Sequence, residues 1–339
     1  MKEYEKSGVS IKEGEAAVQE IKSWVKKTER PEVLSSIGSF GGLFDLNPVI
    51  KDMKRPILVS SIDGVGTKLK IAFLMDKHDT IGQDIVNHCI DDILVQGAFP
   101  LFFMDYIGTG KLSTRVISEI VKGMAVSCEK FNCTLLGGET AEMPGFYQLN
   151  EYDIAGCIFG ILDYEHIITG EKIQNGDIIV GLPSSGLHTN GYSLARRVLF
   201  EKAKFDIQTK CNDLKGTIGE ELLKPHRCYL NELKQFILEK KIHGMAHITG
   251  GGFEGNIKRI LPETVDAVIQ KENWDVPAIF QVIQKEGAIS EAEMYEVFNM
   301  GIGMVIMIHP DELSYFKEKI DELVVLGEIV NGSRKIKLI

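Results

Sequence analysis

The chain has 339 residues, of which 44% are hydrophobic and 25% charged, so it is long enough for two globular domains of ordinary composition. Its net charge of −10 disfavours binding to nucleic acid or to an anionic membrane surface, since both require a basic surface. There is no apolar run of membrane-spanning length, no secretory signal at the N-terminus and no Cys-x-x-Cys pair among the six cysteines. We therefore expect a cytoplasmic protein with reduced cysteines.

Predicted helices and strands alternate along both halves of the chain. In the first half, the apolar pattern predicts a helix at 15–28, a glycine-punctuated loop at 37–42, a strand at 56–62, a helix at 81–96, a strand at 100–107, a helix at 113–131 and strands at 133–136 and 152–162. In the second half it predicts a strand at 178–182, helices at 190–201 and 226–240, a glycine-rich turn at 250–252, a helix, a strand at 298–308, a helix from Pro310 and closing strands. A boundary near 169–170 gives domains 1–169 and 170–339, and the mixture of elements predicts an α/β or α+β fold.

The stretch from Ser60 to Leu69 combines the parts of a site for a metal-bound phosphate. The predicted strand stops at the carboxylate of Asp63, which can hold Mg²⁺. Glycine lets the backbone approach an anion, and consecutive N–H groups can cradle phosphate oxygens. The N–H groups that could hold phosphate here are those of Gly64, Val65, Gly66 and Thr67. Lys68 could neutralise the phosphate charge. The spacing is not that of a P-loop, and the alternative is a tight turn followed by an ordinary solvated lysine.

The predicted helix 81–96 has an acidic face without lysine or arginine to balance it. At 3.6 residues per turn, Asp84, His88, Asp91 and Asp92 fall within one narrow arc. Grouped carboxylates without cations attract a hard cation such as Mg²⁺. The alternative is a solvated acidic face of an exposed helix.

A third acidic position is Glu139, which follows the predicted strand 133–136 in the segment Gly137–Gly145. Ligands of sheet proteins collect at strand ends, although the same residues could form a glycine-rich turn with an exposed acid. Three acidic positions in one domain, beside a loop of glycine and lysine, favour a metal–nucleotide site.

Two glycine-containing turns precede helices in the second half. The segment Pro183–Gly191 holds His188 and Asn190, and helix N-termini bind anions through their N–H groups. His188 could be a general acid or base, a phosphate ligand or a structural histidine, and Asn190 could equally be a helix cap. The glycines that follow His247 could form a second phosphate cradle or a flexible connection; they are Gly250, Gly251 and Gly252.

Together these segments resemble the phosphoribosylformylglycinamidine cyclo-ligases, also called aminoimidazole ribonucleotide synthetases. The resemblance covers nearly the whole chain, and its residues are Arg30–Val33, Gly38–Phe44, Asp63–Lys68, His78–Gly82, Asp105–Tyr106, Gly137–Gly145, Ser184–Leu194, His247–Asn256 and Phe298–Gly301. The segment Asp92–Pro100 fits the Asp-x-x-x-x-Gly-Ala-x-Pro pattern of the wider ATP-using superfamily, which includes selenophosphate synthetase and thiamine-monophosphate kinase. The chain departs from the family where it has Ser61-Ile62 for Gly-Thr, Asp91 for Asn, Phe99 for Glu and His226 for Thr.

The resemblance implies a step of purine biosynthesis. ATP phosphorylates the formamide oxygen of formylglycinamidine ribonucleotide, an amidine nitrogen closes the ring, and aminoimidazole ribonucleotide, ADP and phosphate leave. It also implies a homodimer in which first-domain strands of two subunits join in a barrel, and a second domain with a mixed sheet and helices that completes the active-site cleft. The alternatives are a small-molecule kinase of the same superfamily and a non-catalytic regulator that binds Mg-ATP without turnover.

On this resemblance the cofactors are ATP and Mg²⁺. The residues assigned to Mg²⁺ are Asp63, Asp92, Glu139 and Asp84, and those assigned to catalysis are His188, Lys68 and Asp63. The residues assigned to ATP are Lys22, which matches a family lysine near the nucleotide, Gly64–Lys68, Asn190 and Gly250–Gly252.

Overall fold

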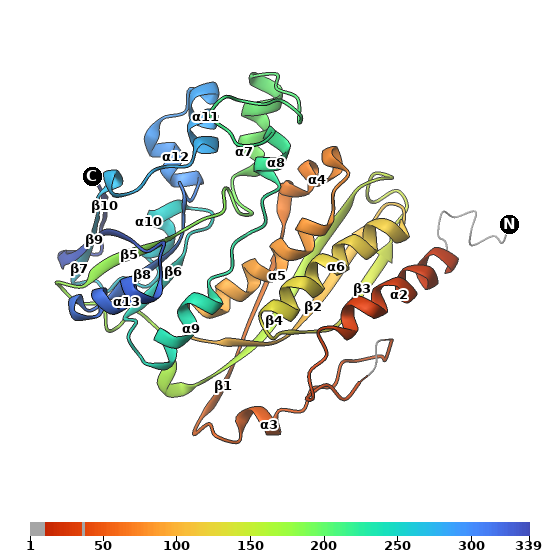
Figure 1. The fold of residues 1–339 in the computed structure, drawn as a ribbon, viewed down its shortest axis with the longest axis horizontal. Coiled ribbons are helices and arrows are strands. Elements are labelled where there is room, and N and C mark those ends of the chain that lie inside the picture. The colour runs from red at the N-terminus through yellow and green to blue at the C-terminus, as the bar shows by residue number, and fades with distance from the viewer. Residues whose placement is uncertain (1–10, 36–37) are drawn as a thin grey trace. The chain divides into compact units, whose positions relative to one another are not determined.

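The computed structural model describes residues 11–35 and 38–339. They form two compact units (Figure 1): unit 1 holds the described residues up to Ile93 together with Ala98–Glu165, and unit 2 holds Leu94–Gly97 and His166–Ile339. Within the described residues, no helix is both long and apolar enough to cross a membrane. Both units mix helices with one sheet, which confirms the predicted α/β (α+β) class.

Unit 1 is a four-stranded sheet of order β1-β4-β2-β3 with helices against it. Its strands are β1 (Pro56–Gly64), β2 (Phe99–Thr109), β3 (Thr134–Glu142) and β4 (Tyr152–Asp163). Its helices are α2 (Ile11–Lys26), α3 (Asn47–Ile50), α4 (Leu69–Met75), α5 (Asp79–Leu94) and α6 (Thr114–Lys130), of which α5 ends in the segment that belongs to unit 2. The helices and strands predicted for this half are therefore present, with ends shifted by a few residues.

Two glycines let α5 and α6 approach closely, and the two helices lie side by side in Figure 1. A Cβ atom on Gly82 would lie 2.0 Å from the carbonyl oxygen of Ile120, and one on Gly123 would lie 2.0 Å from that of Asp79. Ile85 of α5 reaches the sheet, because a Cβ on Gly156 of β4 would meet its side chain at 2.7 Å. The position of α5 over the sheet is thus fixed by backbone contact as well as by side-chain packing.

Unit 2 is a six-stranded sheet of order β10-β7-β9-β5-β8-β6. Its strands are β5 (Ile178–Pro183), β6 (Gly244–His247), β7 (Val265–Ile269), β8 (Ile302–Ile308), β9 (Val324–Asn331) and β10 (Ile336–Leu338). Its helices are α7 (Tyr192–Arg196), which continues as a π-helix over Arg197–Lys202, α8 (Ile218–Leu222), α9 (Leu230–Leu238), α10 (Gly252–Ile257), α11 (Ala278–Gly287), α12 (Glu291–Val297) and α13 (Leu313–Lys319). Every residue of β8 is buried, which is typical of a strand covered on both faces.

Two elements of unit 2 begin later than predicted. The helix expected over 226–240 starts at Leu230, so His226 lies in the connection that precedes it. The strand expected from Phe298 starts at Ile302, because Met300 and Gly301 take left-handed backbone conformations (φ 50° and 98°) that interrupt an extended strand.

Candidate active site

The strand β1 of the unit 1 sheet ends level with the middle of β2 and β3. β4 is antiparallel to β1 and β2, and β2 is parallel to β3, so β1, β2 and β3 run in the same direction. Asp63, Gly156, Asp105 and Gly138 form one row across the four strands. Asp63 thus lies at the carboxyl end of β1, where α/β sheets often bind ligands, whereas β2 and β3 each continue for four residues beyond the row.

A buried histidine joins two of the predicted metal ligands. Nε2 of His88, on α5, lies 2.9 Å from Oδ2 of Asp63 and 3.5 Å from Oδ2 of Asp92. Burial alone would lower the pKa of His88, but hydrogen bonds to the two carboxylates, and their charges, outweigh burial and raise it to about 10. His88 is therefore an imidazolium at neutral pH, and its contact lowers the pKa of Asp63 against the effect of that residue's own burial.

The donor groups around His88 fit Mg²⁺. Asp63 and Asp92 present carboxylate oxygens, which this hard cation prefers, and they converge closely enough to share one imidazolium. The side chain of Asp63 is 44% exposed, so a ligand can reach it. The sequence placed His88 on the acidic arc but assigned it no function, because its contact with Asp63 depends on how α5 packs on β1.

The predicted phosphate loop turns sharply after β1. Asp63 Oδ1 accepts a hydrogen bond from the N–H of Gly64 (2.7 Å), and Gly66 takes a left-handed conformation with φ 69°. Val65 is fully buried and anchors the turn, whereas Gly66 and Thr67 are exposed. The backbone of this loop is thus open to a ligand beside the Asp63 carboxylate.

Lys68 and Asp84 are paired with each other in the interior of unit 1. Nζ of Lys68 lies 2.8 Å from Oδ1 of Asp84, and both side chains are 0% exposed. Burial lowers the pKa of Lys68, although the charge of Asp84 opposes this effect. The sequence predicted a phosphate contact for Lys68 and a metal contact for Asp84; in the structure each is the ionic partner of the other.

Glu139 lies away from Asp63. Glu139 is on β3, three strands from β1, which corresponds to roughly 14 Å at ordinary interstrand spacing. It also points to the opposite face from Gly138 and Asp63, since neighbouring residues of a strand alternate. Glu139 and Asp63 of one chain therefore do not share one coordination sphere. Lys22, on α2, is exposed and donates a hydrogen bond to Gln19 (3.2 Å).

A cavity of about 400 Å³ lies beside Glu139 within unit 1. Its walls are the apolar stripe of α2, the glycine loop 38–42, the first turns of α6, the middle of β2 and most of β3. Asp105 is one of the few acidic groups in these walls; burial raises its pKa to about 7, and the charge of Glu139 adds to the effect.

Asp105→Asn is expected to stabilise the protein relative to wild type as the pH rises. The folded-state pKa of Asp105 lies above its unfolded value, so folding takes up a proton at this site and stability falls as the pH rises from about 4 to about 7. Asparagine does not titrate, so the stability of the variant does not fall with pH through this site. The measurement is the difference in thermal midpoint between variant and wild type at several pH values. The exposed Asp52→Asn is the control, and a difference that does not grow with pH would contradict the assignment.

In unit 2, the two predicted turns converge at one edge of the sheet. β5 and β6 are both antiparallel to β8, so both end at the same edge, and β8 begins there. A Cβ on Gly250, in the turn after β6, would lie 3.3 Å from Oδ1 of Asn190, in the turn after β5. Ser184 donates a hydrogen bond to Asn299, which precedes β8 (3.0 Å). Three chain segments distant in sequence thus form one surface.

The backbone around His188 is held in an unfavourable conformation. His188 has φ 60°, in the left-handed region that costs a residue with a side chain about 1–2 kcal/mol. Its Nε2 accepts a hydrogen bond from the N–H of Ser185 (3.2 Å), and the side chain is 1% exposed. Strain of this kind is often found at functional sites.

Backbone conformation and close packing explain the presence of glycine in the second turn. Gly251 and Gly252 have φ 90° and 58°, and a Cβ on Gly252 would lie 1.8 Å from the carbonyl oxygen of Tyr295. The side-chain amide of Asn256 donates to the carbonyl of Gly252 (2.7 Å), so hydrogen bonding orders the turn. Gly251 also borders a cavity of about 630 Å³, whose walls carry both lysines and glutamates and so do not select for an anion.

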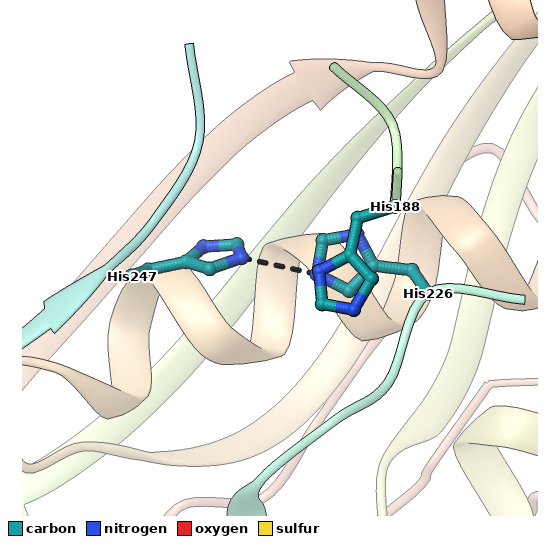
Figure 2. A group of neighbouring side chains, drawn as sticks. All are labelled: His188, His226 and His247. Atoms are coloured by element: carbon teal, nitrogen blue, oxygen red, sulfur yellow. Dashed lines mark hydrogen bonds between the residues drawn. The ribbon is translucent and has the colours of Figure 1, made fainter. Parts of the chain in front are cut away.

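Three histidines of unit 2 come together at this edge (Figure 2). His226 and His247 are hydrogen-bonded through their Nε2 atoms (3.0 Å), and the ring of His188 stacks on that of His226 with centroids 3.9 Å apart. Their exposed fractions are 1%, 1% and 5% for His188, His226 and His247. The sequence carried no spacing signal for this cluster, because each histidine comes from a different segment.

Comparison with known families assigns both halves of the chain. The model described as "AIR synthase related protein, N-terminal domain" matches residues 48–162, and that described as "AIR synthase related protein, C-terminal domain" matches 174–338. Solved structures with the same fold include thiamine-monophosphate kinase from Stenotrophomonas maltophilia (TM-score 0.68, 16% identity, 95% of each chain) and the hydrogenase maturation protein HypE in complex with ATP (TM-score 0.66, 13% identity, 93% of this chain and 88% of the other). These define the class: a two-domain protein of the AIR synthase-related superfamily.

Curated relatives give the particular family. The chain is 49% identical over 339 residues to the phosphoribosylformylglycinamidine cyclo-ligase of Alkaliphilus metalliredigens, covering 99% of this chain and 97% of that protein. It is 50% identical over 337 residues to the enzyme of that name from Geobacillus thermodenitrificans, covering 98% and 97%. The chain belongs to the phosphoribosylformylglycinamidine cyclo-ligase family, which confirms the resemblance found in its motifs.

Proposed function

We propose that this protein catalyses the ATP-dependent cyclisation of formylglycinamidine ribonucleotide to aminoimidazole ribonucleotide, with release of ADP and phosphate, in de novo purine biosynthesis. The observation that carries the proposal is the end-to-end similarity to cyclo-ligases at about half identity. The arrangement of Asp63 and Asp92 around one cationic centre supports it. The likeness to the kinase and to HypE extends to the fold alone and favours neither as a function.

The carboxylates of Asp63 and Asp92 suit the phosphoryl transfer. Mg²⁺, when bound, neutralises charge on the phosphoryl group as it moves from ATP to the formamide oxygen. Asp63 and Asp92 would hold the ion, and the His88 imidazolium keeps the two carboxylates convergent. An amide oxygen is a poor leaving group until it is phosphorylated, so the ring closes after this transfer, and holding the reacting ends together supplies the entropic advantage.

For ATP we propose a site on unit 1. The exposed backbone of Gly66 and Thr67 offers N–H groups to phosphate oxygens, and the 400 Å³ cavity beside α2 offers apolar walls to the base. Lys68 would stabilise the loop through its buried ion pair with Asp84 and would not contact the phosphate directly. Lys22, Asn190 and Gly250–Gly252 stay predicted nucleotide contacts, and Glu139, at the cavity wall, is proposed to act there rather than on the Asp63 ion.

His188 stays a predicted catalytic residue, as proton carrier or phosphate ligand. Its strained backbone supports a functional position, and an imidazole titrates close enough to neutrality to carry a proton. His188→Ala is expected to reduce turnover while ATP binding and folding are retained; stability lost in proportion to activity would instead make it structural.

The direct test mixes the purified protein, Mg-ATP and formylglycinamidine ribonucleotide. We expect aminoimidazole ribonucleotide to form in step with ADP and phosphate, and only when Mg²⁺ and the substrate are both present. ATP binding without product would indicate the regulator, and phosphorylation of a different small molecule would indicate the kinase.

We also propose a homodimer formed through the face of the unit 1 sheet that α5 leaves uncovered. Side chains alternate, so Ile62, Cys157 and Met104 share a row on that face, next to the row of Asp63. Ile62 is 71% and Leu58 is 59% exposed, which leaves apolar surface on an edge strand. We place the enzyme in the cytoplasm, where six cysteines that are all thiols remain reduced.

Ile62→Glu is expected to weaken the dimer at least about 100-fold, because a buried, unpaired charge is costly. The measurement is molar mass by light scattering over a range of protein concentrations. Leu238→Glu, at a similarly exposed leucine of unit 2 (50%), is the control and should leave the mass unchanged. A wild-type protein that is monomeric and fully active at micromolar concentration would refute the proposal.

A further inference from the structure

The cluster of His188, His226 and His247 differs in chemistry from the carboxylates of unit 1. At least one nitrogen of each ring lies within 4.8 Å of one nitrogen of each of the other two, and all three side chains are buried. Only imidazoles make up this group among the described residues of unit 2. Neutral imidazole is a ligand for zinc, copper, nickel and cobalt, whereas Mg²⁺ prefers oxygen.

We propose that His188, His226 and His247 form a binding site for a divalent transition metal of the zinc type. The inference goes beyond the proposed cyclisation and does not depend on it; while the metal is bound, His188 is its ligand and not a proton carrier. Two nitrogens bound to one tetrahedral ion at about 2.0–2.1 Å lie about 3.3 Å apart, and the Nε2 atoms of His226 and His247 are 3.0 Å apart. A metal ion can thus replace the proton that these two rings share, with only a small opening of the pair.

The surroundings of His226 orient it for this function. Its Nδ1 lies 3.4 Å from Oγ1 of Thr189, so a proton on Nδ1 can be donated to the hydroxyl and the lone pair of Nε2 is directed towards His247. Partners of this kind fix the tautomer of a metal-binding histidine and raise metal affinity.

His188 can become the third ligand if its imidazole ring rotates. It is stacked on His226 at an interplanar angle of 27°, so its lone pairs run beside those of His226 rather than towards the same point. The torsion about the Cβ–Cγ bond of histidine is soft, and a rotation there exchanges the contact of Nε2 with the N–H of Ser185 for the metal. Three protein ligands leave a fourth position for water or another small ligand.

The test uses Co²⁺ as a spectroscopic probe on the full-length protein, after chelator treatment and in excess Mg²⁺ to occupy the carboxylates. We expect one equivalent of Co²⁺ to produce visible ligand-field bands of a four-coordinate site, and Zn²⁺ to abolish them by displacement. Loss of a residue that only hydrogen-bonds to a metal ligand typically weakens metal binding about 10–100-fold. His226→Thr removes a ligand itself, so we expect it to weaken Co²⁺ binding by at least this factor. Threonine is also the residue that the family usually has at this position, so the fold should tolerate it.

His309→Gln, at an exposed histidine of the same unit, is the control and should bind Co²⁺ as wild type does. Thermal unfolding checks that each variant is folded, and His247→Gln replaces His226→Thr if the latter is not. Wild-type protein without a ligand-field band at equimolar Co²⁺ would overturn the proposal, and so would equally tight binding by the folded histidine variant.

Discussion

Asp63→Asn should slow turnover by about 10²–10³-fold, the loss expected when one charged group is removed from a centre that stabilises developing negative charge. Asparagine keeps the shape of the side chain but removes the charge that meets Nε2 of His88 at 2.9 Å and that would bind Mg²⁺. The measurement is the rate of aminoimidazole ribonucleotide formation at saturating ATP over a range of Mg²⁺ concentrations. Asp92→Asn should behave similarly, because it removes the second carboxylate of the same pair.

The Mg²⁺ dependence separates a metal ligand from a structural residue. If Asp63 binds Mg²⁺, the variant should need a higher Mg²⁺ concentration for half-maximal rate, and its remaining activity should rise with added Mg²⁺. Asp153→Asn, at an exposed aspartate on β4, is the matched control. A near-normal rate of both Asp63→Asn and Asp92→Asn at limiting Mg²⁺ would show that neither holds the ion.

Lys68→Met should lower the free energy of unfolding by about 3–5 kcal/mol, the usual cost of breaking a buried ion pair from one side. The variant leaves the carboxylate of Asp84 charged in the interior, where both side chains are 0% exposed. Denaturant unfolding monitors the loss. The matched control is Lys70→Met, two residues along: Lys70 also pairs with an acid, Glu151 at 2.6 Å, but its side chain is 39% exposed, so the loss should be about 0–1 kcal/mol.

The double variant Lys68→Met with Asp84→Leu tests what else the pair does. Replacing both members of a buried ion pair with apolar residues is often neutral, so most of the stability should return. If turnover returns with it, the pair only holds the loop in place; if turnover stays low in a stable protein, Lys68 also acts on the phosphate. Lys68→Met as stable as Lys70→Met would contradict the buried pairing.

The predictions that succeeded are those that depend on local pattern. The spacing of Asp84, His88 and Asp92 at intervals of four residues places them on one side of α5 wherever that helix packs. The end of β1 at Asp63 and Gly64 follows from an apolar run and glycine, both readable from a single segment.

The contacts that the sequence did not predict depend on the order of the strands and on depth in the interior. Glu139 and Asp63 both follow predicted strands, but only the order β1-β4-β2-β3 shows that two strands separate β1 from β3. Lysine is rarely fully buried unless it is paired, so the sequence favoured an exposed Lys68. Its pairing with Asp84 could be predicted only by knowing that α5 covers it. The cluster of His188, His226 and His247 required the shared direction of β5 and β6.

The close approach of α5 and α6 has a consequence for how this protein tolerates change. Alanine at Gly82 or Gly123 would put a methyl group 2.0 Å from a carbonyl oxygen of the neighbouring helix, so the helices would have to separate. α5 also carries His88 and Asp92, and its displacement would spread the carboxylate pair. In a random mutagenesis screen for growth without purines, these two glycines should therefore score as intolerant as the charged residues of the site, although neither has a side chain to offer a ligand.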